Sequence, residues 1–152
     1  MSDIMSPAKR RALMQRIKSK NTEPELVVRR ALHVRGIRYR LHVKLAGTRP
    51  DIVLRSHRVA ILVHGCFWHG HNCHLFRWPK TRSDFWKEKI SKNRARDRKV
   101  VRALVKEHWS VATVWECATR DQTPQHLHRL IDGLERWIRR TDRPQTLSLR
   151  GP

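Results

Sequence analysis

The sequence predicts a mixed α/β fold in which a sheet is flanked by helices. Short apolar runs of strand length lie at residues 51–54, 59–63 and 110–115, and segments with helical spacing of apolar residues lie between and around them. A chain of 152 residues with six tryptophans is long enough to bury a core, and neither an internal repeat nor a linker divides it. We therefore expect one domain.

Each expected element follows from a local pattern. Thr22 begins a capping-box pattern, and Gly36 supplies the stop for that helix. The run at 59–63 is apolar throughout, so we expect it to be buried on both faces of the sheet. The elements in order are a basic arm (1–21), a helix from Thr22 to about Arg35, a half-buried strand (37–43), a hairpin (51–54 with 59–63), an irregular segment (64–79), a long helix capped by Ser83, a strand (110–115), a helix from Thr123 to about 139 and a loose tail (140–152).

The charge balance indicates a polyanionic partner. Thirty-four Lys and Arg residues stand against thirteen Asp and Glu residues, which gives a net charge of +21. Nucleic acid is the usual partner of such a chain, because basic side chains displace counterions from phosphates. An anionic membrane surface would favour one basic amphipathic helix instead, and no apolar run is long enough to span a membrane. We expect an intracellular, nucleic-acid-binding protein.

Cysteine and histidine residues indicate a metal site. Cys66, His71 and Cys73 lie within eight residues, and Cys117 follows a distant strand. Three thiolates and one imidazole make the closed tetrahedral set that structural Zn²⁺ uses. His69 and His74 are rival nitrogen ligands. The alternative is that each cysteine is simply a small buried side chain.

Asp51 is the candidate for catalysis. It is the only acidic residue between Glu25 and Asp84. A lone carboxylate on a basic surface is suited to holding Mg²⁺ against a phosphate, and His64 and His69 nearby are suited to proton transfer. The alternative is an ordinary turn residue after Pro50.

Aromatic residues divide into two groups. Phe67 and Trp68 lie in the irregular segment, and large apolar side chains of this kind can enter between base steps as wedges. Trp86, early in the next helix, could act with them. Trp78 fits neither group. The tryptophans expected in the core are Trp109, Trp115 and Trp137.

Several motifs together resemble the very-short-patch-repair (Vsr-type) mismatch endonucleases of bacteria. They are Arg49-Pro50-Asp51, His64-Gly65-Cys66-Phe67-Trp68-His69, His71-Asn72-Cys73, Thr81-Arg82, Phe85-Trp86, Lys89-Ile90, Lys92-Asn93, Arg96-Asp97-Arg98 and Val114-Trp115-Glu116-Cys117. The resemblance covers about residues 10 to 138. It implies a restriction-endonuclease-like fold and a nick 5′ to the thymine of a T·G mismatch that arises when 5-methylcytosine deaminates.

The same resemblance implies roles for individual residues. Asp51 and the main-chain carbonyl of Val63 would bind Mg²⁺, although some family members have a hydroxyl side chain at the position of Val63. His69 would be the general base, His64 a partner of the phosphate or leaving group, Asp97 the residue that orients a histidine, and Glu25 a group acting through water. The zinc ligands would be Cys66, His71, Cys73 and Cys117, and the DNA contacts Phe67, Trp68, Trp86, Met14, Lys89 and a basic arm (1–21) that embraces the duplex.

Two other functions compete with this reading. A non-catalytic zinc module that binds nucleic acid explains the charge and the zinc ligands but not Asp51 beside two histidines. A nuclease that cuts one unmismatched sequence differs only in its substrate. The resemblance further implies a bacterial cytoplasmic, nucleoid-associated protein and a functional link to a DNA cytosine-5 methyltransferase, and we expect a monomer.

Overall fold

The computed structural model describes residues 6–9, 11 and 20–152. Most of the expected arm (1–21), Met14 included, lies outside the described residues. Within them, no helix has the length and apolar character that crossing a membrane requires. The elements are α2 (Glu23–Val34), β1 (Arg40–Leu41), β2 (Ile52–Leu54), a 3₁₀ turn (Arg55–His57), β3 (Val59–His64), α3 (Ser83–Lys106), β4 (Ser110–Trp115), α4 (Glu116–Thr119), α5 (Pro124–Arg139) and β5 (Thr146–Leu149).

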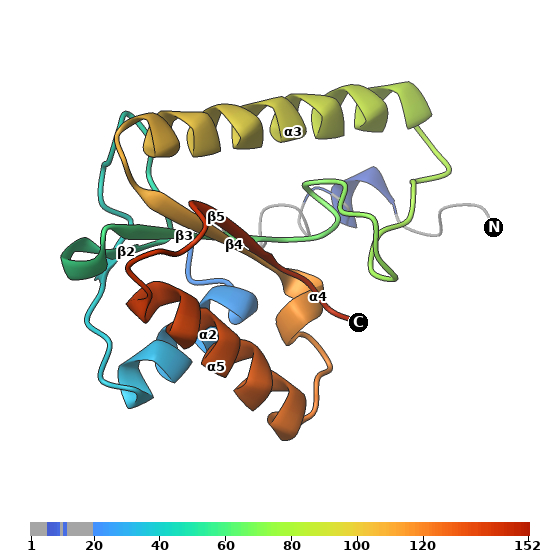
Figure 1. Cartoon of the computed structure of the whole chain (residues 1–152). Coiled ribbons are helices and arrows are strands. Elements are labelled where there is room, and N and C mark those ends of the chain that lie inside the picture. The colour runs from blue at the N-terminus through green and yellow to red at the C-terminus, as the bar shows by residue number, and fades with distance from the viewer. Residues whose placement is uncertain (1–5, 10, 12–19) are drawn as a thin grey trace.

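The predicted mixed α/β class is confirmed by a five-stranded sheet with helices on both faces. The strand order is β1-β2-β3-β4-β5. The β1–β2 and β2–β3 pairs are antiparallel, so the hairpin expected at 51–63 is present, and the β3–β4 and β4–β5 pairs are parallel. Helix α3 connects β3 to β4 along one face of the sheet, whereas α2 and α5 lie on the other (Figure 1).

Each face of the sheet buries its own core. The larger core packs α2 and α5 against the sheet through Val28, Leu32, Ile37, Ile52, Leu54, Val59, Ile61, Ala112, Val114, Ala118, Ile131, Leu134, Trp137 and Ile138. The smaller core packs α3 against the other face through Val53, Ala60, Leu62, Leu104, Trp109 and Val111. Alternate residues of β3 contribute to different cores, which confirms the prediction that this strand is buried on both faces. Trp109 and Trp137 are core residues, as expected.

The sequence prediction was wrong at several element ends. The strand expected at 37–43 is only Arg40–Leu41, because His42 has a left-handed backbone (φ 51°) that ends the pairing. Thr22 makes no capping hydrogen bond with its side chain, although α2 begins where expected. Ser83 is the first helical residue of α3 rather than its cap. By contrast, Thr123 caps α5 as expected, accepting a hydrogen bond from the main chain of His126 (3.1 Å).

The expectation of a loose tail at 140–152 was also wrong. Thr146–Leu149 forms β5, which pairs in parallel with Val111–Val114 of β4. Half of its residues are partly buried, because Leu147 and Leu149 pack against the larger core. The strand therefore extends the sheet and brings the end of the chain beside α4 (Figure 1).

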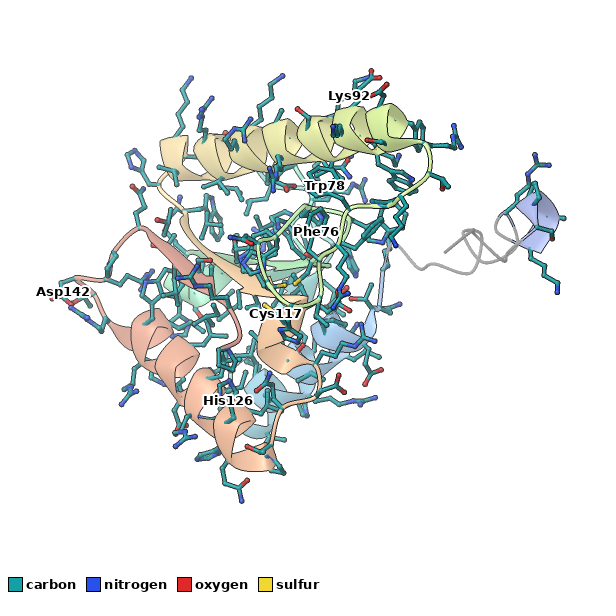
Figure 2. The ribbon with its side chains drawn as sticks, turned by 90° about the vertical axis from the view of Figure 1, so that its right-hand side faces the viewer. Phe76, Trp78, Lys92, Cys117, His126 and Asp142 are labelled. Atoms are coloured by element: carbon teal, nitrogen blue, oxygen red, sulfur yellow. The ribbon has the colours of Figure 1, made fainter. Side chains whose placement is uncertain are left out.

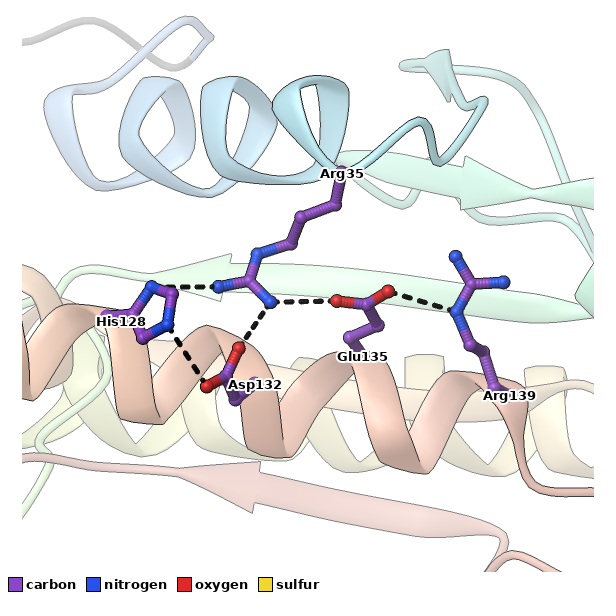
Figure 3. Close-up of polar contacts among 5 residues, drawn as sticks. All are labelled: Arg35, His128, Asp132, Glu135 and Arg139. Carbon is purple, nitrogen blue, oxygen red and sulfur yellow. Dashed lines mark hydrogen bonds and ion pairs between the residues drawn. The ribbon is translucent and has the colours of Figure 1, made fainter.

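An ion-pair network joins the C-terminal end of α2 to α5 (Figure 3). The Arg35 guanidinium donates to Asp132 (2.5 Å) and Glu135 (2.7 Å) and lies 3.3 Å from His128 Nδ1. Hydrogen bonds from Arg35 lower the pKa of both carboxyl groups below their ordinary values. The network fixes α2, and hence the residues that α2 contributes to the site described below, relative to the sheet.

Candidate active site and metal centre

One edge of the sheet gathers the acidic and imidazole side chains. Asp51 directly precedes β2, and antiparallel pairing places this start of β2 beside the end of β3, where Val63 and His64 lie. The main-chain N–H of Val63 donates to Asp51 Oδ2 (2.8 Å). The pKa of the Asp51 carboxyl is raised to about 6, mainly by burial and in part by the neighbouring Glu25, although the hydrogen bond from Val63 opposes the shift. A partly buried carboxylate of this kind is stabilised by a cation.

Glu25 and His42 complete a first cluster around Asp51. Glu25 is 1% exposed on the inner side of α2, and its Oε1 lies 3.0 Å from His42 Nε2. Its other oxygen accepts a hydrogen bond from the main chain of Asn21 (3.1 Å). Ligand atoms of Glu25, His42 and Asp51 all lie within 4.8 Å of one another, so the group has the spacing to hold a metal ion. His42 was not among the residues expected at the site, because the alternating pattern of residues 37–43 predicts an ordinary strand position there.

His64, His69 and Asp97 form a second cluster at the same edge. The two imidazoles are stacked with ring centroids 4.0 Å apart, and His69 Nδ1 lies 2.6 Å from Asp97 Oδ2. His64 Nε2 lies 3.9 Å from the other oxygen of Asp97. The pKa of His64 is lowered to about 4, mainly by burial and in part by the charge of His69, whereas Asp97 opposes the shift. The carboxylate fixes the tautomer and orientation of His69 and leaves its Nε2 available for proton transfer.

Helix α3 holds the irregular segment in place through side chains one turn before Asp97. Asn93 donates to the Trp68 carbonyl (2.8 Å), and Arg94 donates to the carbonyls of His69 (3.3 Å) and Gly70. Gly70 is buried with φ +60°, and a Cβ atom there would meet Ile90 Cγ2 at 2.6 Å. Only glycine allows this approach of the segment to α3 without strain. The approach brings His69 to Asp97, which no periodicity in the sequence reveals.

Cys66, His71, Cys73 and Cys117 come together in a third cluster, with ligand atoms within 4.8 Å of one another. His71 Nδ1 lies 3.6 Å from the sulfurs of both Cys66 and Cys117. His71 is thus the imidazole of the cluster, whereas the rival His69 pairs with Asp97 and the rival His74 is exposed. Burial raises the pKa of the Cys66 thiol. A donor set of three sulfurs and one imidazole fits a tetrahedral zinc ion, which deprotonates coordinated thiols.

Residues around this third cluster position its ligands. The Trp115 ring stacks on His71 with centroids 4.1 Å apart. The expectation that Trp115 lies in the core was therefore wrong, since the residue is partly buried beside the cluster. The main chain of Cys117 donates to Cys66 Sγ, and the main chain of Gly151 donates to Cys117 Sγ, both at 3.3 Å. Such N–H···S contacts stabilise a thiolate. The end of the chain, expected to be loose, therefore contacts the cluster.

Aromatic side chains form a row that includes Trp68, the residue before His69 in the chain. Phe67 contacts both Trp68 and Trp86 with ring centroids 5.2 Å apart. Phe76 lies 6.2 Å from Phe67, and Trp78 lies 5.0 Å from Phe76, so the row continues through the segment that precedes α3. Figure 2 shows Phe76 and Trp78 in this segment, above Cys117. Trp78 is 49% exposed.

The remaining predicted DNA contacts are placed as follows. Lys89 is exposed on the N-terminal half of α3, one residue before the buried Ile90. Met14 lies outside the described residues. Lys89 is therefore accessible on α3, three residues after Trp86.

Sequence comparison with known proteins finds relatives of this chain. The family profile described as DNA mismatch endonuclease Vsr matches residues 2–75. The type II nicking enzyme V.XorIIP of Xanthomonas oryzae pv. oryzae is 54% identical over 122 residues, which cover 80% of this chain and 89% of the relative. V.NmeAIP, a type II nicking enzyme of Neisseria meningitidis, is 42% identical over 133 residues, which cover 86% of this chain and 95% of the relative. DNA mismatch endonuclease Vsr of Escherichia coli is 39% identical over 138 residues, which cover 91% of this chain and 88% of the relative. The chain belongs to the Vsr family of DNA mismatch endonucleases.

Proposed function

We propose that this protein is a Mg²⁺-dependent endonuclease that nicks one DNA strand 5′ to the thymine of a T·G mismatch. The observation that carries the proposal is the meeting of two clusters at one sheet edge: partly buried Asp51 with Glu25, and the His69–Asp97 pair with stacked His64. Names of the relatives, which include a mismatch endonuclease and nicking enzymes, support both the substrate and the cutting of one strand. The five-stranded mixed sheet supports a restriction-endonuclease-like fold.

Hydrolysis adds water across a phosphodiester P–O bond. A Mg²⁺ ion held by Asp51, with the Val63 carbonyl and Glu25 contributing, would neutralise the charge that develops on the phosphate. His69 Nε2 accepts a proton from the attacking water, and Asp97 stabilises the imidazolium so formed through the 2.6 Å contact at Nδ1. His64, stacked on His69, serves the phosphate or the departing oxygen. The chain thus supplies the base, its orienting carboxylate and the cation ligands.

The aromatic row supports the recognition of a mismatch. Phe67, Trp68 and Trp86 act as the wedge, because unstacking a base step costs least where pairing is already weak. The net charge of +21 supplies the affinity for phosphates, with Lys89 near the wedge and the basic arm (1–21) around the duplex. A cytosine-5 methyltransferase would create the methylated base whose deamination gives the lesion. We propose that one chain acts alone.

We propose that Zn²⁺ bound by Cys66, His71, Cys73 and Cys117 has a structural role. Four protein ligands leave no position for substrate, which is typical of structural zinc. The ion ties the irregular segment to α4, since Cys117 belongs to α4 and the other three ligands to the segment. Zinc binding therefore contributes directly to the free energy of folding.

An end-labelled duplex tests the proposal. A duplex with one T·G mismatch in a CT(A/T)GG-like context is incubated with the protein, with and without Mg²⁺, beside a matched duplex and the Asp51→Ala variant. The expected result is a Mg²⁺-dependent nick 5′ to the thymine that both controls lack. Equal cutting of matched and mismatched duplexes would refute mismatch specificity. Tight binding without cutting would replace the proposal with a non-catalytic zinc module.

A further inference from the structure

His42 has a position that the proposed mechanism does not use. It directly follows β1, and its left-handed backbone (φ 51°) turns the side chain toward Glu25 and Asp51. Its main-chain N–H donates to the Asp51 carbonyl (3.2 Å), which fixes it to the residue whose side chain belongs to the same cluster. The imidazole is 18% exposed and its Nε2 atom is fully enclosed. The imidazole is thus held in the acidic cluster by its main chain, which is bonded to Asp51, and by its ring, which lies against Glu25.

Two enclosed atoms of this cluster face each other without a hydrogen bond. Glu25 Oε1 and His42 Nε2 lie 3.0 Å apart, yet neither has a hydrogen-bond partner of acceptable geometry among the residues that the structure describes. Arg29 does not satisfy Glu25 Oε1, because its Nη1 lies 3.6 Å away and instead donates to Asn21 Oδ1 at 2.6 Å. Leaving such enclosed atoms unpaired is unfavourable, because each has lost its hydrogen bonds to water. Their arrangement therefore calls for a shared partner.

A divalent cation is the partner that suits these atoms. Two neighbouring ligands of an octahedral ion, each at about 2.1 Å, lie roughly 3 Å apart, close to the separation of Glu25 Oε1 and His42 Nε2. Asp51 adds the third ligand atom within 4.8 Å. A cation accepts lone pairs from the imidazole and from both carboxylates at once.

We propose that His42 is a direct ligand of the divalent cation that Asp51 holds, and that its nitrogen makes the site prefer Mn²⁺ to Mg²⁺. The proposal rests on the proposed function in one respect, namely that Asp51 binds a cation. Oxygen ligands alone suit Mg²⁺, whereas an imidazole nitrogen favours the borderline transition metals. A site of two carboxylates and one imidazole therefore still accepts Mg²⁺ but binds Mn²⁺ more tightly.

Electron paramagnetic resonance tests this proposal without DNA and without activity. The zinc-loaded full chain is titrated with Mn²⁺, and the loss of the free-ion signal gives the Kd, while Mg²⁺ competition gives the Kd for Mg²⁺. Electron spin-echo modulation of the bound Mn²⁺ then reports whether a ¹⁴N nucleus is a ligand. The variant is His42→Gln, whose amide oxygen keeps a hard ligand of similar reach. His33→Gln, an exposed histidine on α2, is the matched control, and Asp51→Ala removes the carboxylate.

The expected results separate the proposal from the function on which it rests. His42→Gln should weaken Mn²⁺ binding about 10–100-fold, shift Mg²⁺ binding much less and remove the ¹⁴N modulation, whereas His33→Gln should change none of these. If Asp51→Ala abolishes Mn²⁺ binding but His42→Gln leaves both Kd and ¹⁴N modulation unchanged, the role of His42 is wrong and the role of Asp51 stands. If Mn²⁺ does not bind, or binds equally to Asp51→Ala, both are wrong. Unchanged thermal unfolding of His42→Gln would show that a lost signal is not lost fold.

Discussion

Gly70→Ala tests the contact that places His69 against Asp97. At this position a Cβ atom would meet Ile90 Cγ2 at 2.6 Å and Arg94 Nη2 at 2.8 Å. Ile90 is 1% exposed on α3 and has little room to move. The change therefore forces the irregular segment away from α3, which separates the imidazole from its carboxylate.

Two contributions set the magnitude. A left-handed backbone costs an alanine about 1–2 kcal/mol relative to glycine, and overpacking a filled site costs about 1–3 kcal/mol more. Gly47→Ala is the matched control, because Gly47 has a similar φ (+72°) but nothing within 4 Å of the added Cβ. We therefore expect a loss of roughly 2–5 kcal/mol for Gly70→Ala and roughly 1–2 kcal/mol for Gly47→Ala. In a domain of this size each kcal/mol lowers the Tm by about 2–4 °C.

Urea and thermal unfolding of the zinc-loaded proteins measure the two losses, and single-turnover nicking measures the consequence for chemistry. Gly70→Ala should unfold at a Tm lower than that of Gly47→Ala by about 2–12 °C and should nick much more slowly, while Gly47→Ala nicks at the wild-type rate. If the two variants are equally stable, the close approach of the segment to α3 is wrong, and with it the reason given for the His69–Asp97 contact.

Three further predictions concern the base, the zinc ion and the α2–α5 network. Asp97→Asn should lower the single-turnover nicking rate about 10²–10⁴-fold with DNA binding unchanged, because the amide does not stabilise the imidazolium. The control is Asp121→Asn, because the Asp121 side chain is 86% exposed. Nicking rates of the two variants within about threefold of each other would contradict the role of Asp97. Cys73→Ser should contain no zinc by elemental analysis and should melt about 10 °C lower, since metal binding is coupled to folding; a wild type without zinc would disprove the site. Arg35→Met should lower the Tm at neutral pH. The difference in Tm between wild type and variant should vanish as the pH falls from about 4.5 through the lowered pKa values of Asp132 and Glu135, because these carboxylates contribute stability only while ionised. A difference that persists at pH 2 would mean that packing, not charge, is responsible.

Elements with a clear apolar period could be predicted from the sequence. The hairpin of β2 and β3 and the helix α5 follow from runs of Val, Ile and Leu whose spacing matches one face or two faces of an element. The strand β5 was missed, because Thr146–Leu149 has only two apolar residues and pairs through its main chain with a distant strand. Main-chain pairing with a remote partner leaves little trace in local composition.

The candidate site shows the same division. Residues with distinctive chemistry, such as Cys117 and Asp51, could be selected from the sequence, and the structure brings them into clusters. His42 was missed, because its role depends on a left-handed backbone conformation that ends β1 one residue after Leu41. The choice among the histidines, with His71 in the sulfur cluster, likewise depends on the turn around Gly70, which is a tertiary feature.

Asp51→Asn tests the central claim, that the sheet-edge clusters hydrolyse DNA, most directly. The amide preserves the size of the side chain and the hydrogen-bonding position beside Val63 but removes the charge that a cation requires. Zinc content, affinity for a T·G duplex and the single-turnover nicking rate are measured on the same preparation. We predict unchanged zinc, DNA affinity close to wild type and a nicking rate reduced at least about 10³-fold. Nicking at a rate comparable to wild type would contradict the account, because the cation would then be held elsewhere.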